Sequence, residues 1–452
     1  MPEFSSQYQI YAAQNSHLNG AIRLAFRFLS LWLRVYPNCE CNSDIVGLVA
    51  RTLVLTNDFP PRRGGIESFV KALADRLNDL PSVADIHSVP GLSAADISDS
   101  SVVVYTASMP GSSLVDPQLP YPVIRDRAST LLPTRRVRRK VVKTFRKYNC
   151  DRVLIGSSVP LGLLAPALRA AGAQKIVALT HGHEVMYARY PFARGLLRRV
   201  AAAVDYLPAI TKWTRGKIGK ALGPETSRVK QTLLQPGVDV EAFHPGAGGA
   251  EIRSTLGIPT SAPVVVCAAR AVPRKGHDRL ISAWPAVLQA VPDARLILVG
   301  EGPELDTLHR QAEHLGLGSP SEVTGRVPVI FVGAVPWPEV PAYIDAADVF
   351  VMLCRSHWLG FAEGFGIVFL EAAACGKPVI VGRSGGAPEA VLNGVSGYVV
   401  NPNDIDQIAA RIIELLKDPE KAREMGARGR SWVTRKHTWD KTARELAQIL
   451  LT

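Results

Sequence analysis

Two glutamates that lie eight positions apart are the first candidates for chemistry in this sequence. Glu363 opens the run EGFGIVFLE and Glu371 closes it. The glycines at 364 and 366 suit a turn that opens a helix, where backbone N–H groups can bind a phosphate. Glu371 is then expected about two turns along that helix from Glu363, near the same face. Both carboxylates could accept hydrogen bonds from sugar or ribose hydroxyls, although glutamates at this spacing are also common on ordinary charged helix faces.

A basic loop supplies positive charge. Residues 270–276 read RAVPRKG and closely follow the apolar run VVVCA at 264–268. In parallel α/β sheets, ligands sit beyond the carboxyl ends of the strands, so this loop is expected at a binding site. Arg270 and Lys275 could stabilise a diphosphate whose charge builds up as a glycosidic bond breaks. The alternative is that both are ordinary solvated loop cations.

Two histidines lie in another loop. His181 and His183 belong to the run THGHE, which follows an apolar run at 176–179. A histidine at the end of a buried strand could orient a sugar through a hydrogen bond, and it could also be a structural loop residue. Asp58 lies in the turn-rich loop NDFPPRRGG after the run TLVLT. It could contact an acceptor or cap a turn, and the residues alone leave both roles open.

The elements that must position these loops alternate between strands and helices. Short apolar, β-branched runs alternate with helical stretches, which indicates parallel α/β architecture. The expected strands lie at residues 52–56, 102–105, 153–155 and 176–179, and again at 264–268, 295–299, 348–353 and 378–381. Prolines and glycines between 236 and 249 mark a hinge or linker. The sequence therefore predicts two doubly wound Rossmann-like domains that face each other across a cleft.

The domain boundaries follow from this pattern. Residues 51–240 are predicted to form the first domain and residues 241–436 the second, and a closing helix over about 437–452 could pack back on the first domain. Residues 1–50 form an extension of unassigned role. Its segment 21–36 is apolar with three arginines, so it could be a helix at an anionic membrane surface or an extension outside the fold. The arginines that interrupt the apolar region disfavour a signal peptide.

One stretch departs from the regular alternation. The run TGRVPVIFVGAV at 324–335 holds two similar Gly-x-Val pieces, which is consistent with a short insertion or duplication beside one strand. Either copy could occupy the position in the sheet.

Composition excludes several classes of protein. Of the 452 residues, 47% are hydrophobic and 20% are charged, so the chain can bury cores and is not a disordered tail. Six cysteines are too few for a disulfide scaffold and fit a reducing compartment. No run reaches the ~18–20 apolar residues of a membrane span, so a soluble protein is expected.

The net charge of +12 is unevenly divided. Residues 1–250 hold 31 basic and 18 acidic residues, a net of +13, whereas residues 251–452 hold 21 and 22, a net of −1. Eight cations fall in the run TRRVRRKVVKTFRK at 134–147, where Val137, Val141 and Phe145 form a narrow apolar stripe on one helical face. Such a helix could dock on anionic lipid headgroups, or it could pack by its stripe on the sheet with its charges solvated.

Taken together, these motifs resemble those of family 4 retaining glycosyltransferases with the GT-B fold. The similarity rests on the loop at 56–65, on THGHE at 180–184, on Arg270 with Lys275 and Gly276, on the run at 363–371 and on SGGAPE at 384–389. It extends from about residue 52 to the end of the chain. Among subfamilies, NDFPPRRGG and THGHEV are most similar to the actinobacterial phosphatidylinositol-mannoside mannosyltransferases that use GDP-mannose.

The resemblance implies an acceptor-binding first domain, a nucleotide-sugar-binding second domain and a role for each matched residue. Catalysis is expected from His181, Arg270, Lys275 and Glu363, with both cations on the donor diphosphate and Glu363 on the transferred sugar. The donor is expected to contact Gly64, Gly65, Arg270, Lys275, Glu363, Gly364, Phe365, Gly366, Ile367 and, through its ribose, Glu371. The acceptor or membrane side is expected to include Asp58, Arg62, Arg63, Arg135, Arg136, Arg138, Arg139 and Lys140.

The implied reaction is transfer of a hexose, mannose from GDP-mannose, onto a phosphatidylinositol mannoside at the inner, cytoplasmic face of the cell membrane. The route is front-face attack by the acceptor hydroxyl, without a cofactor or a metal, and no His, Asp and Glu cluster has metal-ligand spacing. A UDP-sugar donor and a soluble acceptor stay open. Two alternatives come from other classes. A basic nucleic-acid-binding protein lacks support because no recognition module is visible, and Glu363, Glu371 and His181 together argue against a non-catalytic sugar-nucleotide-binding protein.

Overall fold

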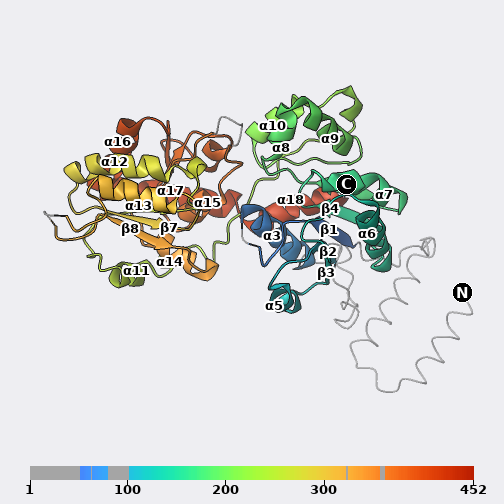
Figure 1. Ribbon diagram of the computed structural model, residues 1–452, viewed down its shortest axis with the longest axis horizontal. Coiled ribbons are helices and arrows are strands. Elements are labelled where there is room, and N and C mark those ends of the chain that lie inside the picture. The colour runs from blue at the N-terminus through green and yellow to red at the C-terminus, as the bar shows by residue number, and fades with distance from the viewer. Residues whose placement is uncertain (1–50, 63, 80–100, 322–323, 357–361, 452) are drawn as a thin grey trace, which may run out of the picture.

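The computed structural model describes residues 51–62, 64–79, 101–321, 324–356 and 362–451, which fold into two α/β domains (Figure 1). The extension at 1–50 and Arg63, for which the sequence makes predictions, lie outside the described residues. Each domain is built on one parallel sheet, as the alternation of apolar runs and helical stretches predicts.

Within the described residues, the sheet of the first domain has five strands in the order β3-β2-β1-β4-β5. These strands are β1 (Thr52–Thr56), β2 (Val102–Ala107), β3 (Val123–Asp126), β4 (Arg152–Ile155) and β5 (Lys175–Ala178). The helices around them are α3 (Gly65–Asp79), α5 (Ser112–Val115), α6 (Arg135–Lys147), α7 (Ala165–Ala170), α8 (Glu184–Arg189), α9 (Pro191–Ala201) and α10 (Lys212–Gly219).

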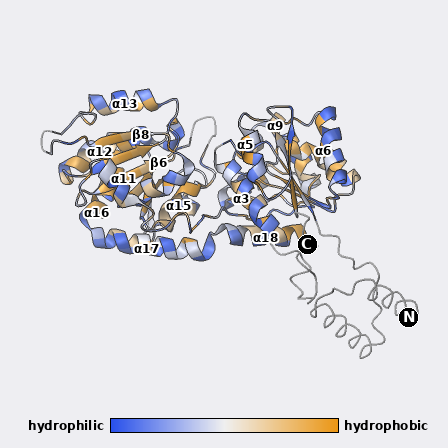
Figure 2. Cartoon of the chain, turned by 90° about the horizontal axis from the view of Figure 1, so that it is seen from below, coloured by the Kyte–Doolittle hydropathy of each residue, from blue (hydrophilic) through white to orange (hydrophobic). Residues whose placement is uncertain are grey.

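Both faces of this sheet are buried, which explains why its strands read as unbroken apolar runs. In β1, Leu53 and Leu55 belong to a core shared with α6 and α7, whereas Val54 belongs to the core that includes α3. Figure 2 shows the apolar residues concentrated in the strands. Each fully buried aliphatic side chain of this kind contributes about 1.5–3 kcal/mol to stability.

The sheet of the second domain, over the same described part of the chain, has six strands in the order β11-β10-β9-β6-β7-β8. They are β6 (Val264–Ala268), β7 (Arg295–Val299), β8 (Val329–Gly333), β9 (Val349–Met352), β10 (Val379–Gly382) and β11 (Gly397–Val400). The helices are α11 (Gly249–Thr255), α12 (His277–Ala290), α13 (Leu305–His314), α14 (Val340–Asp345), α15 (Ile367–Ala374), α16 (Ile405–Lys417) and α17 (Pro419–Lys436).

Two of the described strands, β3 and β11, are missing from the sequence prediction, which leaves the position of β8 open within residues 324–335. The run of β3 is broken by Arg125 and Asp126, so its apolar signal is too short to recognise. The structure also shows which part of the stretch 324–335 enters the sheet. β8 lies between the two Gly-x-Val pieces and ends at Gly333, the first residue of the second piece. It pairs with β7 through Val329 opposite Leu296 and Ile330 opposite Ile297.

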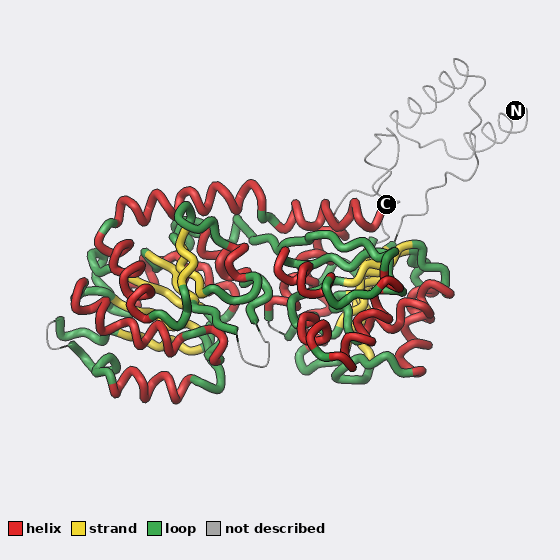
Figure 3. The backbone as a smooth tube through the Cα atoms, turned by 90° about the horizontal axis from the view of Figure 1, so that it is seen from above, coloured by secondary structure: helices red, strands yellow, loops and turns green. Residues whose placement is uncertain are grey.

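The last two helices connect the domains. α17 runs along the second domain, and α18 (Trp439–Leu451) continues onto the first, as Figure 3 shows. Trp439 packs edge-on against Phe69 of α3 with 5.6 Å between the ring centroids. Asp440 forms an ion pair with Arg76 of the same helix at 2.8 Å. The end of the chain therefore ties α3, and the loop that precedes it, to the second domain.

Candidate active site

Loops from both domains meet at the carboxyl ends of the two sheets. The first domain contributes the loops after β1 and β5, and the second contributes the loops after β6 and β9. The two backbones touch there, because a Cβ atom added at Gly182 would lie 2.9 Å from the Cα atom of Gly364. A side chain at position 364 would collide with the first domain, so the glycine is needed there for packing as well as for the predicted approach to a phosphate.

A buried ion pair joins two of the predicted residues. The Nζ atom of Lys275 donates to Oε2 of Glu363 at 2.8 Å, and Nη1 of Arg274 donates to the same oxygen at 3.0 Å. The thiol of Cys354 lies 3.8 Å from it. Only 12% of the Glu363 side chain and 14% of the Lys275 side chain are exposed. Arg274 belongs to the site but was not predicted, because nothing in the sequence RAVPRKG distinguishes it from an ordinary loop arginine.

Both members of this pair stay charged. Burial by itself would raise the pKa of the Glu363 carboxyl, but Lys275 and Arg274 outweigh burial and hold that pKa below its ordinary value. Burial would likewise lower the pKa of Lys275, and Glu363 raises it instead. Because the side-chain contacts of Glu363 with the described residues all use Oε2, its second carboxylate oxygen has no partner among those residues and could bind a ligand.

The helix after Glu363 starts later than predicted. α15 begins at Ile367, and its N-cap is Gly366 with a left-handed φ of 87°. Glu363 and Glu371 therefore do not lie two turns apart on one helix, as the sequence analysis expects. Glu363 instead belongs to the preceding loop, where its ion pairs hold it, and Phe365 is buried beside it in the same loop.

Glu371 lies one turn into α15 with an unused carboxylate. In the part of the chain that the structure describes, this carboxylate has no ion pair or side-chain hydrogen bond. Burial raises the pKa of its carboxyl to about 7. Near pH 7 the Glu371 carboxyl is therefore about half ionised, and without a partner among the described residues it can accept hydrogen bonds from the hydroxyl groups of a ligand.

Arg270 lies apart from the Lys275–Glu363 pair and close to the first domain. Its side chain is exposed and makes no ion pair with any described residue. Its charge nevertheless acts on Glu67 of α3. Burial raises the pKa of the Glu67 carboxyl, and the charges of Arg62 and Arg270 offset part of that rise. Arg270 and the first turn of α3 are therefore neighbours across the two domains.

The loop after β1 ends in the predicted glycine pair. Gly65 is the first residue of α3, and a Cβ atom added at Gly64 would lie 2.4 Å from Oε2 of Glu67. Arg62 forms ion pairs with Glu67 at 3.1 Å and with Asp58 at 3.5 Å. Glu67 was not predicted as a site residue. The sequence feature that could have indicated it is an acidic residue in the first turn of a helix, where the helix dipole favours negative charge.

The protonation state of His181 follows from its contacts. Its Nε2 atom bonds to the carbonyl oxygen of Gly156, and a carbonyl oxygen can only accept, so Nε2 carries the hydrogen. Burial lowers the pKa of His181, and the ring is therefore neutral near pH 7 with Nδ1 as an acceptor. His183 is more exposed and bonds through Nε2 to Ser157 at 3.1 Å.

A buried glutamate holds the histidine loop in place. Glu184 accepts the backbone N–H groups of His181 at 2.9 Å and Gly182 at 3.2 Å through Oε2. Its Oε1 accepts the hydroxyl of Ser158 at 3.2 Å. No role was predicted for Glu184, because the sequence alone does not reveal that its side chain is completely buried.

The basic helix α6 packs by its stripe and exposes its charges. Val137, Val141 and Phe145 are buried on the sheet. Two of the predicted surface cations, Arg136 and Lys140, pair with the buried Asp126 at 2.7 and 3.4 Å. The remaining predicted cations of this helix, Arg135, Arg138 and Arg139, are exposed and have no ion pair among the described residues.

The described residues contain neither a cluster of metal ligands nor a helix that could span a membrane. No three His, Cys, Asp or Glu side chains within them are grouped as the ligands of a metal ion would be. None of the helices in the same part of the chain is long and apolar enough to cross a membrane.

Comparison with known proteins identifies relatives that match most of the chain. The family model for glycosyl transferases group 1 matches residues 250–432. The chain is 39% identical to a GDP-mannose-dependent alpha-(1-6)-phosphatidylinositol monomannoside mannosyltransferase of Mycolicibacterium smegmatis, over 88% of this chain and 97% of the relative. It is 38% identical to a GDP-mannose-dependent monoacylated alpha-(1-6)-phosphatidylinositol monomannoside mannosyltransferase of Corynebacterium glutamicum, with the same coverage of 88% and 97%.

Solved structures confirm the predicted fold. Anabaena Alr3699/HepE in complex with UDP aligns with a TM-score of 0.69 at 23% identity and covers 88% of this chain and 99% of its own. WaaG, a glycosyltransferase involved in lipopolysaccharide biosynthesis, aligns with a TM-score of 0.57 at 18% identity, with coverage of 88% and 99%. At these identities the likeness concerns the GT-B arrangement of two α/β domains.

The role of Glu184 can be tested by comparing two substitutions. Glu184→Ala leaves the N–H groups of His181 and Gly182 and the hydroxyl of Ser158 without their acceptor, so it should lower the free energy of unfolding by about 2–4 kcal/mol. Glu184→Gln keeps an acceptor and should cost much less. Urea denaturation followed by circular dichroism measures both, and equal effects of the two variants would contradict this role.

Proposed function

The chain belongs to the group 1 glycosyltransferase family that includes the phosphatidylinositol monomannoside mannosyltransferases, and on this premise we propose that it transfers mannose from GDP-mannose to a phosphatidylinositol-mannoside glycolipid. The observation that carries the proposal is the buried Lys275–Glu363 pair at the point where both domains meet. Relatives named for this donor and this class of acceptor, 38–39% identical over nearly their whole length, support the choice of substrates.

The cations of the second domain provide the main stabilisation of the leaving group. Negative charge builds on the diphosphate as its bond to the sugar breaks, and fixed positive charges in a site with little water stabilise that charge. Lys275 is held by Glu363, so its ammonium group needs little reorganisation during the reaction. Arg270, exposed and unpaired among the described residues, completes the clamp from the side of the first domain. The residues thus supply positive charge for a route that needs neither a metal nor a cofactor.

The acceptor hydroxyl attacks the anomeric carbon from the face that the diphosphate leaves, which retains the configuration. The departing phosphate oxygen takes the hydroxyl proton, so the protein does not have to supply a base. The unused oxygen of Glu363 and the Nδ1 acceptor of His181 can each receive a hydrogen bond from a hydroxyl of the transferred sugar. Their contribution is to position the sugar.

Helix α6 gives the first domain a surface for an anionic membrane. Its unpaired cations point away from the sheet, and each contributes about 1 kcal/mol of attraction close to anionic lipids. A hollow on the outer side of this helix is lined by Arg139, Lys143, Arg146 and Lys147 around Val142. The enzyme would then work as a peripheral protein on the inner face of the cell membrane, where its lipid acceptor is located.

Transfer and the role of Lys275 are tested in one assay. Purified protein receives labelled GDP-mannose and vesicles that contain phosphatidylinositol mannoside, and labelled lipid is counted. Lys275→Ala should lower kcat about 10²–10³-fold, because a fixed charge on the leaving group is lost. Lys417→Ala, at an exposed position on α16, is the control and should keep the full rate. A near-normal rate for Lys275→Ala would contradict its role, and transfer from UDP-sugars or to soluble sugars alone would overturn the proposed substrates.

The raised pKa of Glu371 makes a prediction about pH. If the ionised carboxylate accepts the ribose hydroxyls, GDP binding releases the proton, so affinity should rise up to about tenfold between pH 6 and pH 8. Calorimetric titration with GDP at both pH values measures the change. Glu371→Gln removes this titration but leaves that of the GDP phosphates, so any rise specific to Glu371 should disappear in the variant. The same rise in both proteins would contradict the assignment.

Membrane contact is tested by vesicle flotation. Replacing Arg135, Arg138 and Arg139 with glutamate should reduce binding to anionic vesicles at least tenfold, because three attractive charges become repulsive. Arg136 and Lys140 are left in place because they neutralise the buried Asp126. The matched control reverses Arg423, Arg435 and Lys436, which are exposed on α17 of the second domain. Equal binding of both triple variants would contradict docking through α6.

A further inference from the structure

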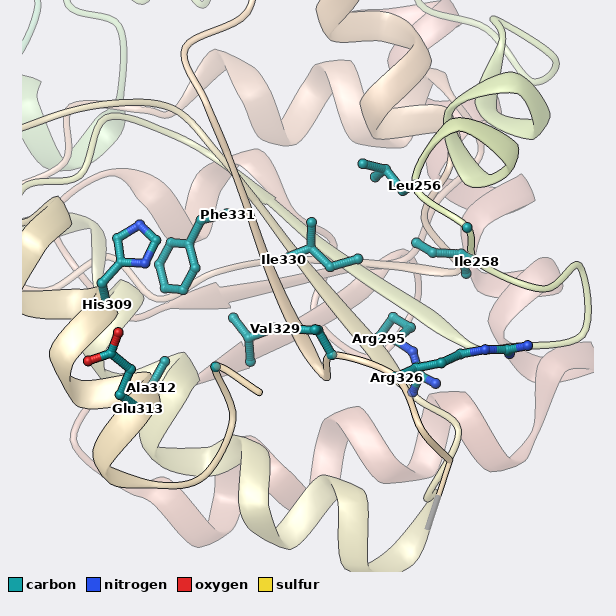
Figure 4. A pocket seen from close by; sticks show the side chains of 13 residues that line it. Leu256, Ile258, Arg295, His309, Ala312, Glu313, Arg326, Val329, Ile330 and Phe331 are labelled. Carbon is teal, nitrogen blue, oxygen red and sulfur yellow. The ribbon is translucent and has the colours of Figure 1, made fainter. Parts of the chain in front are cut away.

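A cavity of about 450 Å³ lies in the second domain, away from the loops of the candidate active site. Strand β8 forms one wall with Val329, Ile330 and Phe331, and Ile258 adds to the apolar lining, as Figure 4 shows. The cavity reaches Arg295, the first residue of β7, and therefore lies at the amino ends of the strands. The candidate active site lies at their carboxyl ends, ~16 Å from Arg295 along the five-residue strand β7.

Arg295 is a buried cation that forms no ion pair with a described residue. Only 1% of this residue is exposed. Its Nη1 atom donates to the carbonyl oxygens of Asp293 and Ala294, each at 2.9 Å, and its Nη2 atom donates to the hydroxyl of Thr324 at 3.4 Å. No described residue forms an ion pair with it. These neutral acceptors satisfy hydrogen bonds but do not neutralise the charge, and a buried charge without an opposite charge is costly.

A second cation stands beside the first. Arg326 lines the same end of the cavity (Figure 4) and is itself exposed, without an ion pair in the described part of the chain. Burial lowers the pKa of Arg295, Asp293 offsets part of that shift, and the like charge of Arg326 adds to it. The carboxylate that lines the cavity, Glu313, lies with His309 toward the opposite end. An anion between the two guanidinium groups would relieve their repulsion.

We propose that this cavity is a binding site for a small organic anion with an apolar body. Its sulfonate, carboxylate or phosphate group would lie between Arg295 and Arg326. Its body would pack on Val329, Ile330 and Phe331, and the ring of Phe331 is already fixed by stacking on His309 with 3.9 Å between the centroids. The cavity is within the size range of ~300–1,000 Å³ that small-molecule sites occupy. The site is separate from the proposed transferase function and does not depend on it.

Fluorescence titration of the full chain with 8-anilinonaphthalene-1-sulfonate tests the proposal. This probe combines a sulfonate with an apolar body, and saturable binding of one molecule per chain is expected. Arg326→Gln should weaken binding at least fivefold, and because Arg326 is exposed the variant should fold normally. Arg310→Gln is the matched control, since this exposed arginine of α13 does not line the cavity.

A second control separates this cavity from the basic hollow on α6. Arg139→Gln removes a cation from that hollow and should leave binding unchanged. The proposal is overturned if binding is not saturable, or if Arg326→Gln behaves like Arg310→Gln. It is also overturned if Arg139→Gln is the variant that weakens binding.

Discussion

The charge of Glu363 is the constraint around which the candidate active site is organised. A carboxylate with little access to water is stable only when ion pairs and hydrogen bonds replace the water that it has lost. Lys275 and Arg274 do so from the short turn at Pro273–Lys275, and the loop after β6 therefore has to lie against the loop after β9. The backbone carbonyl of Glu363 also accepts the N–H group of Gly386 at 2.9 Å, which adds the loop after β10 to the assembly.

The first domain meets this assembly through backbone contacts and one carboxylate. A Cβ atom at Gly386 would lie 2.2 Å from the carbonyl oxygen of Gly364, so the loops of the second domain have no room for side chains there. Glu389 then accepts the N–H groups of Lys212 and Trp213, both at 2.9 Å, at the start of α10. A carboxylate is favoured at that position because a helix N-terminus carries partial positive charge. The contact of Gly182 with Gly364 and the hydrogen bonds of Glu389 thus hold the histidine loop close to Glu363.

The sequence predicts the fold better than the site because burial of whole strands is visible in it and burial of single polar groups is not. Strands covered on both faces, such as β1 and β6, have continuous apolar sequences. β3 ends in Arg125 and Asp126, so its sequence does not show this pattern. The spacing of Glu363 and Glu371 suggests one helix, but the left-handed Gly366 starts α15 only afterwards. Glu184 and Arg274 act through hydrogen bonds that form only in the folded chain, and no local sequence pattern predicts these bonds.

Ion pairs within the protein also determine which cations can bind an anionic ligand or lipid. The +12 net charge includes every cation, yet Arg136 and Lys140 already neutralise the buried Asp126. What distinguishes a cation that could bind a ligand is the lack of an ion pair with any residue that the structure describes. Arg270 at the domain boundary meets that criterion, as does the exposed face of α6. Arg295 meets it most strictly, because its guanidinium is buried, bonds to neutral acceptors and forms no ion pair with a described residue.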